Sequence, residues 1–212
     1  MEMVPQNIKN IIFDFGAVIY DIDIDKTVQA FKALRITNYD TFDEFMASQR
    51  DARIYLDIET GKISPKEFRD AIRANVDLKI SDKAIDFAWN AMLVGYVKER
   101  LDLLCELKTK YRTFLLSNTN SIHWDYFSNQ LQEYGYSGLH ELFEKDYYSH
   151  NLGMRKPDLN IFKHVLNDSN LVARETLFLD DNLMNIEAAR MVGIPSIQIT
   201  KELDMLTVFG RN

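Results

Sequence analysis

Short apolar runs alternate with amphipathic helical segments along this chain, and this alternation restricts its fold more than any other feature. Buried strands are predicted over residues 8–15, 111–117, 176–180 and 195–199, with a weaker candidate at 146–149. Helical spacing of apolar residues marks the intervening segments 98–110 and 157–166. Strands separated by helices of this length form a parallel sheet covered on both faces. The sequence therefore predicts an α/β fold.

Residues 26–95 interrupt this alternation directly after the first predicted strand. They contain no strand signal but several helix starts. Thr41–Glu44 and Ser64–Glu67 are both capping boxes, and the second has a proline at its first helical position. Ser81 opens a third candidate helix. We therefore expect residues 26–95 to form an all-helical insertion.

The overall composition excludes several classes of protein. The 32 acidic residues exceed the 25 basic residues, and the net charge of −7 argues against binding to nucleic acid or an anionic membrane surface. A single cysteine, Cys105, rules out an intramolecular disulfide and a multi-cysteine metal site. Neither a signal peptide nor an apolar run of transmembrane length is apparent, which favours a cytoplasmic protein.

Polar residues follow the predicted strands where an open parallel sheet binds its ligands, beyond the carboxyl ends of the strands. The segments concerned are Asp14, 117–120, 155–157 and 180–182. Each segment alone is ordinary turn or helix-cap material. Together they suit phosphoryl transfer, with a carboxylate nucleophile, further carboxylates that need a hard cation such as Mg²⁺, a hydroxyl and a lysine.

The order of these segments resembles the four motifs of the haloacid dehalogenase superfamily of aspartate-nucleophile hydrolases. FDFGAVIYDID, LLSNTN, LGMRKPD and LFLDDNLMNIEAA closely resemble its bacterial α-D-glucose-1-phosphate phosphatase branch. The resemblance covers essentially the whole chain. It implies a Rossmann-like catalytic core at 1–25 and 96–212, with a helical cap at 26–95.

The resemblance also implies a role for each motif residue. Asp14 would attack the phosphoryl group and form an aspartyl-phosphate, while Ser117, the Asn118 backbone and Lys156 would bind the phosphate. Asp180 would hold the metal through water or orient Lys156. The Mg²⁺ ligands would be Asp14, the backbone carbonyl of Gly16 and Asp181.

The cap is expected to select the substrate. The turn at 59–62 resembles the specificity loop of capped relatives, in which Glu59 or Lys62 could hydrogen-bond a sugar hydroxyl. An ordinary solvated corner between two helices would give the same sequence. The substrate would be a small phosphorylated metabolite, such as glucose 1-phosphate, and the chain a monomer or a homodimer.

One position departs from the superfamily pattern. Most of its phosphatases carry a second aspartate two residues after the nucleophile, and here that position is Gly16. A general acid/base of this kind contributes about 10²–10⁴-fold in rate. Asp21, Asp23 and Asp25 would share one face of a strand, but a solvated edge is the favoured explanation, so none of the three is assigned a catalytic role; His123 is a weaker substitute still.

Two other functions therefore remain open. A 2-haloacid dehalogenase also uses an aspartate nucleophile, although it has no need for Asp180 and Asp181 as metal carboxylates. A catalytically weak member that only binds a phosphorylated ligand would explain Gly16.

Overall fold

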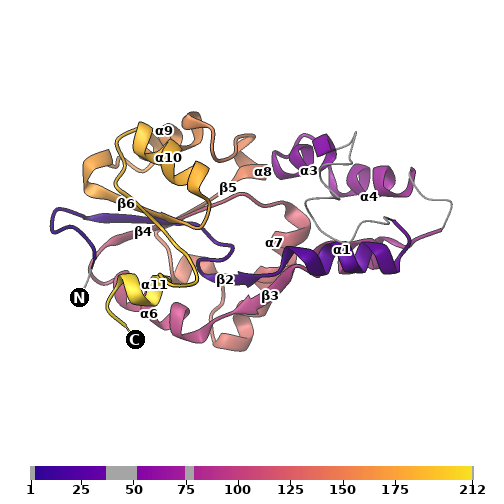
Figure 1. Cartoon of the computed structure of the whole chain (residues 1–212), viewed down its shortest axis with the longest axis horizontal. Helices are drawn as coiled ribbons and strands as arrows, with labels where there is room; N and C mark the ends of the chain where they lie inside the picture. The colour runs from indigo at the N-terminus through magenta and orange to yellow at the C-terminus, as the bar shows by residue number, and fades with distance from the viewer. Residues whose placement is uncertain (1–2, 37–51, 75–78, 212) are drawn as a thin grey trace.

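The computed structural model describes residues 3–36, 52–74 and 79–211 and is built around a five-stranded parallel sheet (Figure 1). Across the sheet, the strands are β5 (Lys145–Tyr148), β4 (Arg112–Ser117), β1 (Asn10–Phe13), β6 (Thr176–Asp180) and β7 (Ser196–Gln198). In the central strand β1, Ile12 lies opposite Phe114 of β4 and Phe178 of β6. Each strand overlaps one of the predicted apolar runs, and the predicted fold class is confirmed.

The helices of this core connect the strands, except that the last of them follows the final strand β7. They are α6 (Lys98–Leu107), α7 (Ser121–Gln130), α8 (Ser149–Leu152), α9 (Leu159–Asp168), α10 (Leu183–Met191) and α11 (Met205–Val208), with 3-10 turns at Leu131–Tyr134, Leu139–Glu141 and Ala173–Glu175.

Within the described ranges, no helix combines the length and apolar character needed to cross a bilayer.

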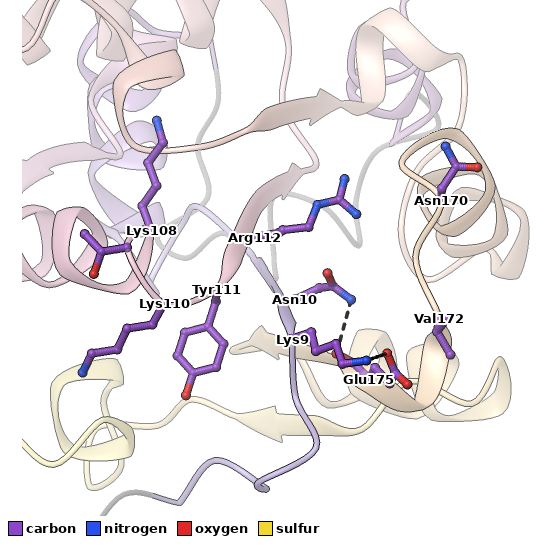
Figure 2. Close-up of a pocket in the computed structure, with 10 residues that line it drawn as sticks. Lys9, Asn10, Lys108, Lys110, Tyr111, Arg112, Asn170, Val172 and Glu175 are labelled. Carbon is purple, nitrogen blue, oxygen red and sulfur yellow. Dashed lines mark hydrogen bonds and ion pairs between the residues drawn. The ribbon is translucent and has the colours of Figure 1, made fainter.

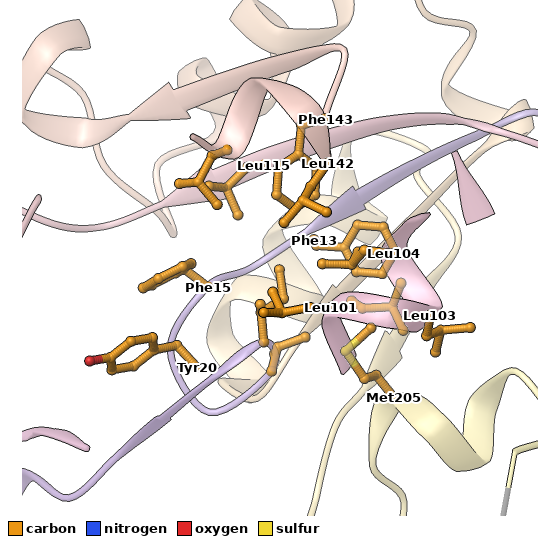
Figure 3. Close-up of a cluster of buried hydrophobic side chains, with 14 of the residues drawn as sticks. Phe13, Phe15, Tyr20, Leu101, Leu103, Leu104, Leu115, Leu142, Phe143 and Met205 are labelled. Carbon is orange, nitrogen blue, oxygen red and sulfur yellow. The ribbon is translucent and has the colours of Figure 1, made fainter. Parts of the chain in front are cut away.

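Alternate residues of β1 face opposite sides of the sheet, as the pleat of a strand requires. On one side, Ile11 and Phe13 pack with leucines of α6 and with Met205 of α11 (Figure 3). On the other side, Ile12 packs with apolar residues of α9 and α10. Both faces of the sheet are therefore covered, which is why β1 is almost continuously apolar.

The cap inserted after β1 is mainly helical and has a hydrophobic core of its own. Its helices are α1 (Ile24–Ala33), α3 (Ala52–Glu59), α4 (Pro65–Ala74) and α5 (Asp82–Asn90), which lie to one side of the sheet in Figure 1. Phe31, Phe68 and Trp89 are buried in this cluster, and Ile122 of α7 packs against it from the catalytic core. The cap therefore rests on α7.

Two of the predicted helix starts in the cap are confirmed. Ser64 and Glu67 form a reciprocal capping box, in which the Ser64 backbone N–H donates to Glu67 Oε2 at 2.8 Å and the Glu67 N–H donates to Ser64 Oγ at 3.3 Å. Ser81 accepts from the Ala84 N–H at 3.2 Å. The capping box predicted at Thr41–Glu44 lies outside the described residues.

The insertion is not entirely helical, contrary to expectation. β3 (Leu93–Tyr96) pairs antiparallel with β2 (Tyr20–Ile22), so a short hairpin-like ribbon joins the cap to the core. The sequence gives little signal for β3, because the strand has only four residues and contains Gly95. It also crosses the expected boundary at 95/96, so the division into 1–25, 26–95 and 96–212 stays a prediction.

The three alternating aspartates do not share a strand face. β2 ends at Ile22, Asp23 occupies the N-cap position of α1, and Asp25 lies in the first turn of that helix. Asp21 forms an ion pair with Arg100 at 2.7 Å. The helix start thus separates carboxylates that an extended strand would have aligned.

Candidate active site

The candidate catalytic residues meet at the carboxyl ends of β1, β4 and β6. Asp14 directly follows β1, and its N–H donates to the Leu179 carbonyl of β6 at 2.8 Å. Ser117 is the last residue of β4 and Asp180 the last of β6. Because parallel strands end at one edge, residues more than a hundred positions apart lie together.

Lys156 joins this group from the loop that precedes α9. Its Nζ lies 2.6 Å from Asp14 Oδ1 and 2.6 Å from Asp180 Oδ2, and the side chain is only 1% exposed. Burial alone would lower the pKa of Lys156, but the two carboxylates outweigh it and raise the pKa above its ordinary value. Lys156 is therefore a fixed ammonium between two acids.

The Asn118 side chain holds the backbone at Lys156. Its Nδ2 donates to the Lys156 carbonyl at 2.9 Å, and its Oδ1 accepts from the Lys156 N–H at 2.9 Å. This reciprocal pair ties the loop after β4 to the loop before α9. The Asn118 amide thus positions the lysine, a role that the sequence did not suggest.

Asp180 is enclosed by hydrogen-bond donors. Besides Lys156, it accepts from the Asn182 N–H at 2.8 Å and from Asn185 Nδ2 at 3.0 Å to each of its oxygens. Its side chain is fully buried. Of the two roles expected for Asp180, these contacts support the orientation of Lys156.

Asp14, Asp180 and Asp181 form a cluster suited to a metal ion. Each offers a carboxylate oxygen, and these oxygens lie within 4.8 Å of one another. Three carboxylates against one lysine leave a net charge of −2 when all are ionised, which a divalent cation balances. Oxygen donors are what Mg²⁺ prefers. Asp181 is exposed, and its carboxylate has no side-chain partner among the described residues.

The acidic surroundings of Asp14 favour the binding of a cation beside its carboxylate. Burial raises its pKa to about 7, repulsion from Asp180 and Asp181 adds to this, and Lys156 opposes it. The pKa of Asp181 is also raised, first by the partial loss of solvation of its carboxylate within the cluster and then by repulsion from Asp180. A cation between them would favour the ionised carboxylates that a nucleophile and its metal ligands require.

A cavity of about 380 Å³ opens beside this cluster, between the core and the cap. Its polar lining includes Ser117, Asn118, Asn182, Glu59, Arg155 and His123. The other walls are mostly apolar: Phe15, Ile22, Ile24, Tyr55, Leu56, Trp89, Met92, Leu93 and Phe127. Ser117 Oγ has no protein partner among the described residues, so it can bind a ligand in the cavity.

The expected cap residue Glu59 reaches this cavity, whereas Lys62 is not part of its lining. Glu59 Oε2 lies 3.0 Å from Arg155 Nη2, which links the end of α3 to the loop before Lys156. Burial raises the pKa of Glu59, and the arginine opposes the shift. Arg155 adjoins a motif lysine, but nothing in its sequence context indicated a contact with the cap.

Apolar surroundings occupy the space beside Gly16. A Cβ built on Gly16 would lie 3.3 Å from Ile22 Cδ1, and Ile22 lines the same cavity. Among the described residues, no hydrogen bond is donated to the backbone carbonyl of Gly16, two residues after Asp14. The described residues thus place a hydrophobic side chain where an acid/base aspartate would extend.

A second cleft, of about 410 Å³, lies at the opposite end of the sheet, where β1 and β4 begin (Figure 2). It is rich in basic residues, but Lys9 pairs with Glu175 at 2.8 Å and Arg112 with Glu144 at 2.6 Å. Two of its four basic lining residues are thus paired with acids, Lys108 Nζ donates to the backbone carbonyls of His140 and Glu141 at 3.1 and 2.8 Å, and none of the candidate catalytic residues lines the cleft.

Known proteins resemble this chain over nearly its full length. It is 34% identical to the D-ribitol-5-phosphate phosphatase of Bacteroides thetaiotaomicron over 90% of this chain and 91% of that protein. It is 29% identical to a sesquiterpene phosphatase of Aspergillus oryzae over 92% of this chain and 91% of that protein.

A solved structure of a haloacid dehalogenase-family enzyme from B. thetaiotaomicron, in complex with magnesium and inorganic phosphate, superposes with a TM-score of 0.85. It shares 35% identity and covers 95% of this chain and 99% of its own. The family model for haloacid dehalogenase-like hydrolases matches residues 8–193. This chain therefore belongs to the haloacid dehalogenase-like hydrolase family.

Proposed function

We propose that this protein is a Mg²⁺-dependent phosphatase that hydrolyses a small phosphorylated metabolite through an aspartyl-phosphate on Asp14. The observation that carries the proposal is the placement of the Asp14 carboxylate, 2.6 Å from a buried lysine and within 4.8 Å of the Asp181 ligand oxygen. The magnesium and phosphate bound by the similar B. thetaiotaomicron enzyme support it.

The reaction proceeds in two displacements. A carboxylate oxygen of Asp14 attacks phosphorus, the bond from phosphorus to the substrate oxygen breaks, and the departing alkoxide takes a proton from water. Water then attacks the phosphorus of the aspartyl-phosphate, which releases inorganic phosphate and restores the Asp14 carboxylate. Ser117 Oγ, the Asn118 N–H and Lys156 bind the non-bridging oxygens. Asp14, the Gly16 carbonyl and Asp181 would hold Mg²⁺, which would neutralise developing charge.

The absence of an acid/base at position 16 favours substrates with a good leaving group. A glycosyl 1-phosphate fits this condition, because an anomeric hydroxyl is more acidic than an ordinary alcohol. Glucose 1-phosphate therefore remains one candidate. The names of the relatives add a pentitol phosphate and a terpenoid phosphate as classes to test.

Phosphate release is the direct test of the proposed function. The panel contains glucose 1-phosphate, D-ribitol 5-phosphate, a prenyl phosphate and 2-chloropropionate, each with Mg²⁺ or with EDTA. Metal-dependent release of phosphate supports the phosphatase. Metal-independent release of chloride would favour a dehalogenase, and Mg²⁺ binding without any turnover would favour the ligand-binding alternative.

Asp181→Ala should separate metal binding from folding. Because Asp181 is exposed, we expect a change of no more than about 0.5 kcal/mol in the free energy of unfolding. The Mg²⁺ concentration for half-maximal activity should increase by at least about 100-fold, since even groups that only support metal ligands contribute ~10–100-fold. A Mg²⁺ titration of phosphate release measures this shift.

Glu187→Ala is the matched control, because Glu187 is an exposed carboxylate on α10 that does not belong to the metal cluster. Its Mg²⁺ dependence should equal that of the wild type. An unchanged titration for Asp181→Ala would remove Asp181 from the metal site.

A further inference from the structure

We infer that His123 is a specificity-determining residue, whose Nε2 accepts a hydrogen bond from a hydroxyl on the carbon skeleton of the phosphorylated substrate. This inference rests on the proposed phosphatase function. It assigns the substrate to the polyhydroxylated esters rather than to alkyl or terpenoid phosphates.

His123 is held in one orientation by the cap. Its Nδ1 lies 2.7 Å from Asn90 Oδ1, and its ring stacks on Trp89 with centroids 4.8 Å apart and planes 20° from parallel. The residue is 7% exposed. A ring fixed on two sides can present its remaining nitrogen in a single direction.

The contact with Asn90 also fixes the tautomer. A carbonyl oxygen only accepts hydrogen bonds, so the His123 nitrogen that faces it carries the proton. Burial lowers the pKa of His123 to about 3, which keeps the ring neutral at physiological pH. Nε2 is therefore left with a lone pair and no proton.

That lone pair is available in the cavity. His123 lines the cavity, and its Nε2 has no hydrogen-bond partner among the described residues. Nε2 is also absent from the described side-chain nitrogen and oxygen atoms that are both inaccessible to solvent and without a hydrogen bond. It is thus an accessible acceptor without a protein donor, which a ligand hydroxyl can satisfy.

Because the remaining walls of the cavity are mostly apolar, the Nε2 acceptor can discriminate between substrates with and without hydroxyl groups. Trp89, Tyr55 and Phe127 offer apolar surface to any carbon skeleton, with or without hydroxyls. In such a cavity, a few fixed polar groups determine which ligand binds and in which orientation. Glu59 is already paired with Arg155, whereas Nε2 of His123 has no partner of its own.

His123 does not replace the absent acid/base at position 16. A neutral ring whose only proton faces Asn90 has no proton at Nε2 to give to a leaving group. Its effect is therefore expected on the choice of substrate, not on the chemistry common to all substrates.

The experiment compares kcat/KM for D-ribitol 5-phosphate and n-pentyl phosphate, two five-carbon esters that differ in their hydroxyls. The wild type should prefer the polyol ester by at least about 10-fold, because a site built to bind a hydroxyl discriminates against the analogue that lacks it. His123→Asn keeps a donor for Asn90 but removes the acceptor at Nε2. It should reduce the preference by about 10–100-fold, and His123→Gln, which restores an acceptor near that place, should recover part of it.

His164→Asn is the matched control, because His164 lies on α9 against Tyr147 and does not line the cavity. It should leave the preference unchanged. Equal losses for both esters in His123→Asn would mark a purely structural role and overturn the inference. A higher kcat/KM of the wild type for n-pentyl phosphate than for D-ribitol 5-phosphate would also overturn the inference, whatever the variants show. Absence of metal-dependent release from every phosphate ester of the panel would instead overturn the proposed function, and the inference with it.

Discussion

Asp14→Asn should reduce phosphate release by at least about 10⁴-fold, since loss of the nucleophile removes the covalent route altogether. The amide keeps the shape of the side chain but has no carboxylate to attack phosphorus. Lys156 keeps its other partner Asp180 at 2.6 Å, so the site should remain assembled. Single-turnover assays with Mg²⁺ measure the rate, and acid-quenched protein reveals whether the phosphoenzyme forms.

Binding should survive in this variant. Its site carries one negative charge less, which reduces repulsion toward an anionic ester, so phosphate affinity should be at least that of the wild type. Asp102→Asn is the matched control, because Asp102 forms an exposed pair with Lys98 and is remote from the cluster. Its activity should equal that of the wild type. Turnover of Asp14→Asn within 10-fold of this control would exclude Asp14 as the nucleophile.

The arrangement of the strand-end residues could be predicted from the sequence because it follows from topology. Once the runs that end near Asp14, Ser117 and Asp180 are assigned to a parallel sheet, their carboxyl ends must share an edge. The family resemblance assigns Lys156 to the phosphate that Asp14 attacks, and in the structure its Nζ lies 2.6 Å from Asp14 Oδ1. The roles of these residues stay predictions until they are tested.

Contacts between the cap and the core could not be predicted in this way. Arg155 reaches Glu59, and His123 reaches Asn90, only because two separately packed units meet at a particular angle. No spacing along the chain encodes that angle. β3 could not be predicted for a local reason: four residues with a glycine give too little periodic signal, and pairing with β2 supplies the stability that the sequence pattern lacks.

The role of Asp180 illustrates a further limit. Residue type alone does not distinguish the two adjacent carboxylates, and only the family resemblance assigns Asp181 to the metal directly and leaves two roles open for Asp180. In the structure, the first is fully buried among Lys156, Asn182 and Asn185, while the second is exposed. The alternation of a strand decides which of two neighbours faces inward, and the turn after β6 decides which donors surround it.

Lys156→Met should destabilise the protein by about 3–5 kcal/mol in EDTA, the usual cost of removing one partner from a buried ion pair. Methionine has a similar length, so the loss is one of charge rather than of packing. Asp14 and Asp180 would then face each other without the ammonium that now lies 2.6 Å from each. Urea denaturation measures the change, and the rate of phosphate release should fall by about 10²–10³-fold.

Lys98→Met supplies the comparison, because it removes the same charge from an ion pair whose lysine is 67% exposed. Such a pair contributes at most about 1 kcal/mol. Mg²⁺ should recover part of the stability of Lys156→Met, since the cation binds the carboxylates that the lysine no longer neutralises, and this binding stabilises the folded state. Lys98→Met should show no such extra gain over the wild type. Equal destabilisation of the two variants would mean that Lys156 does not hold the carboxylates together.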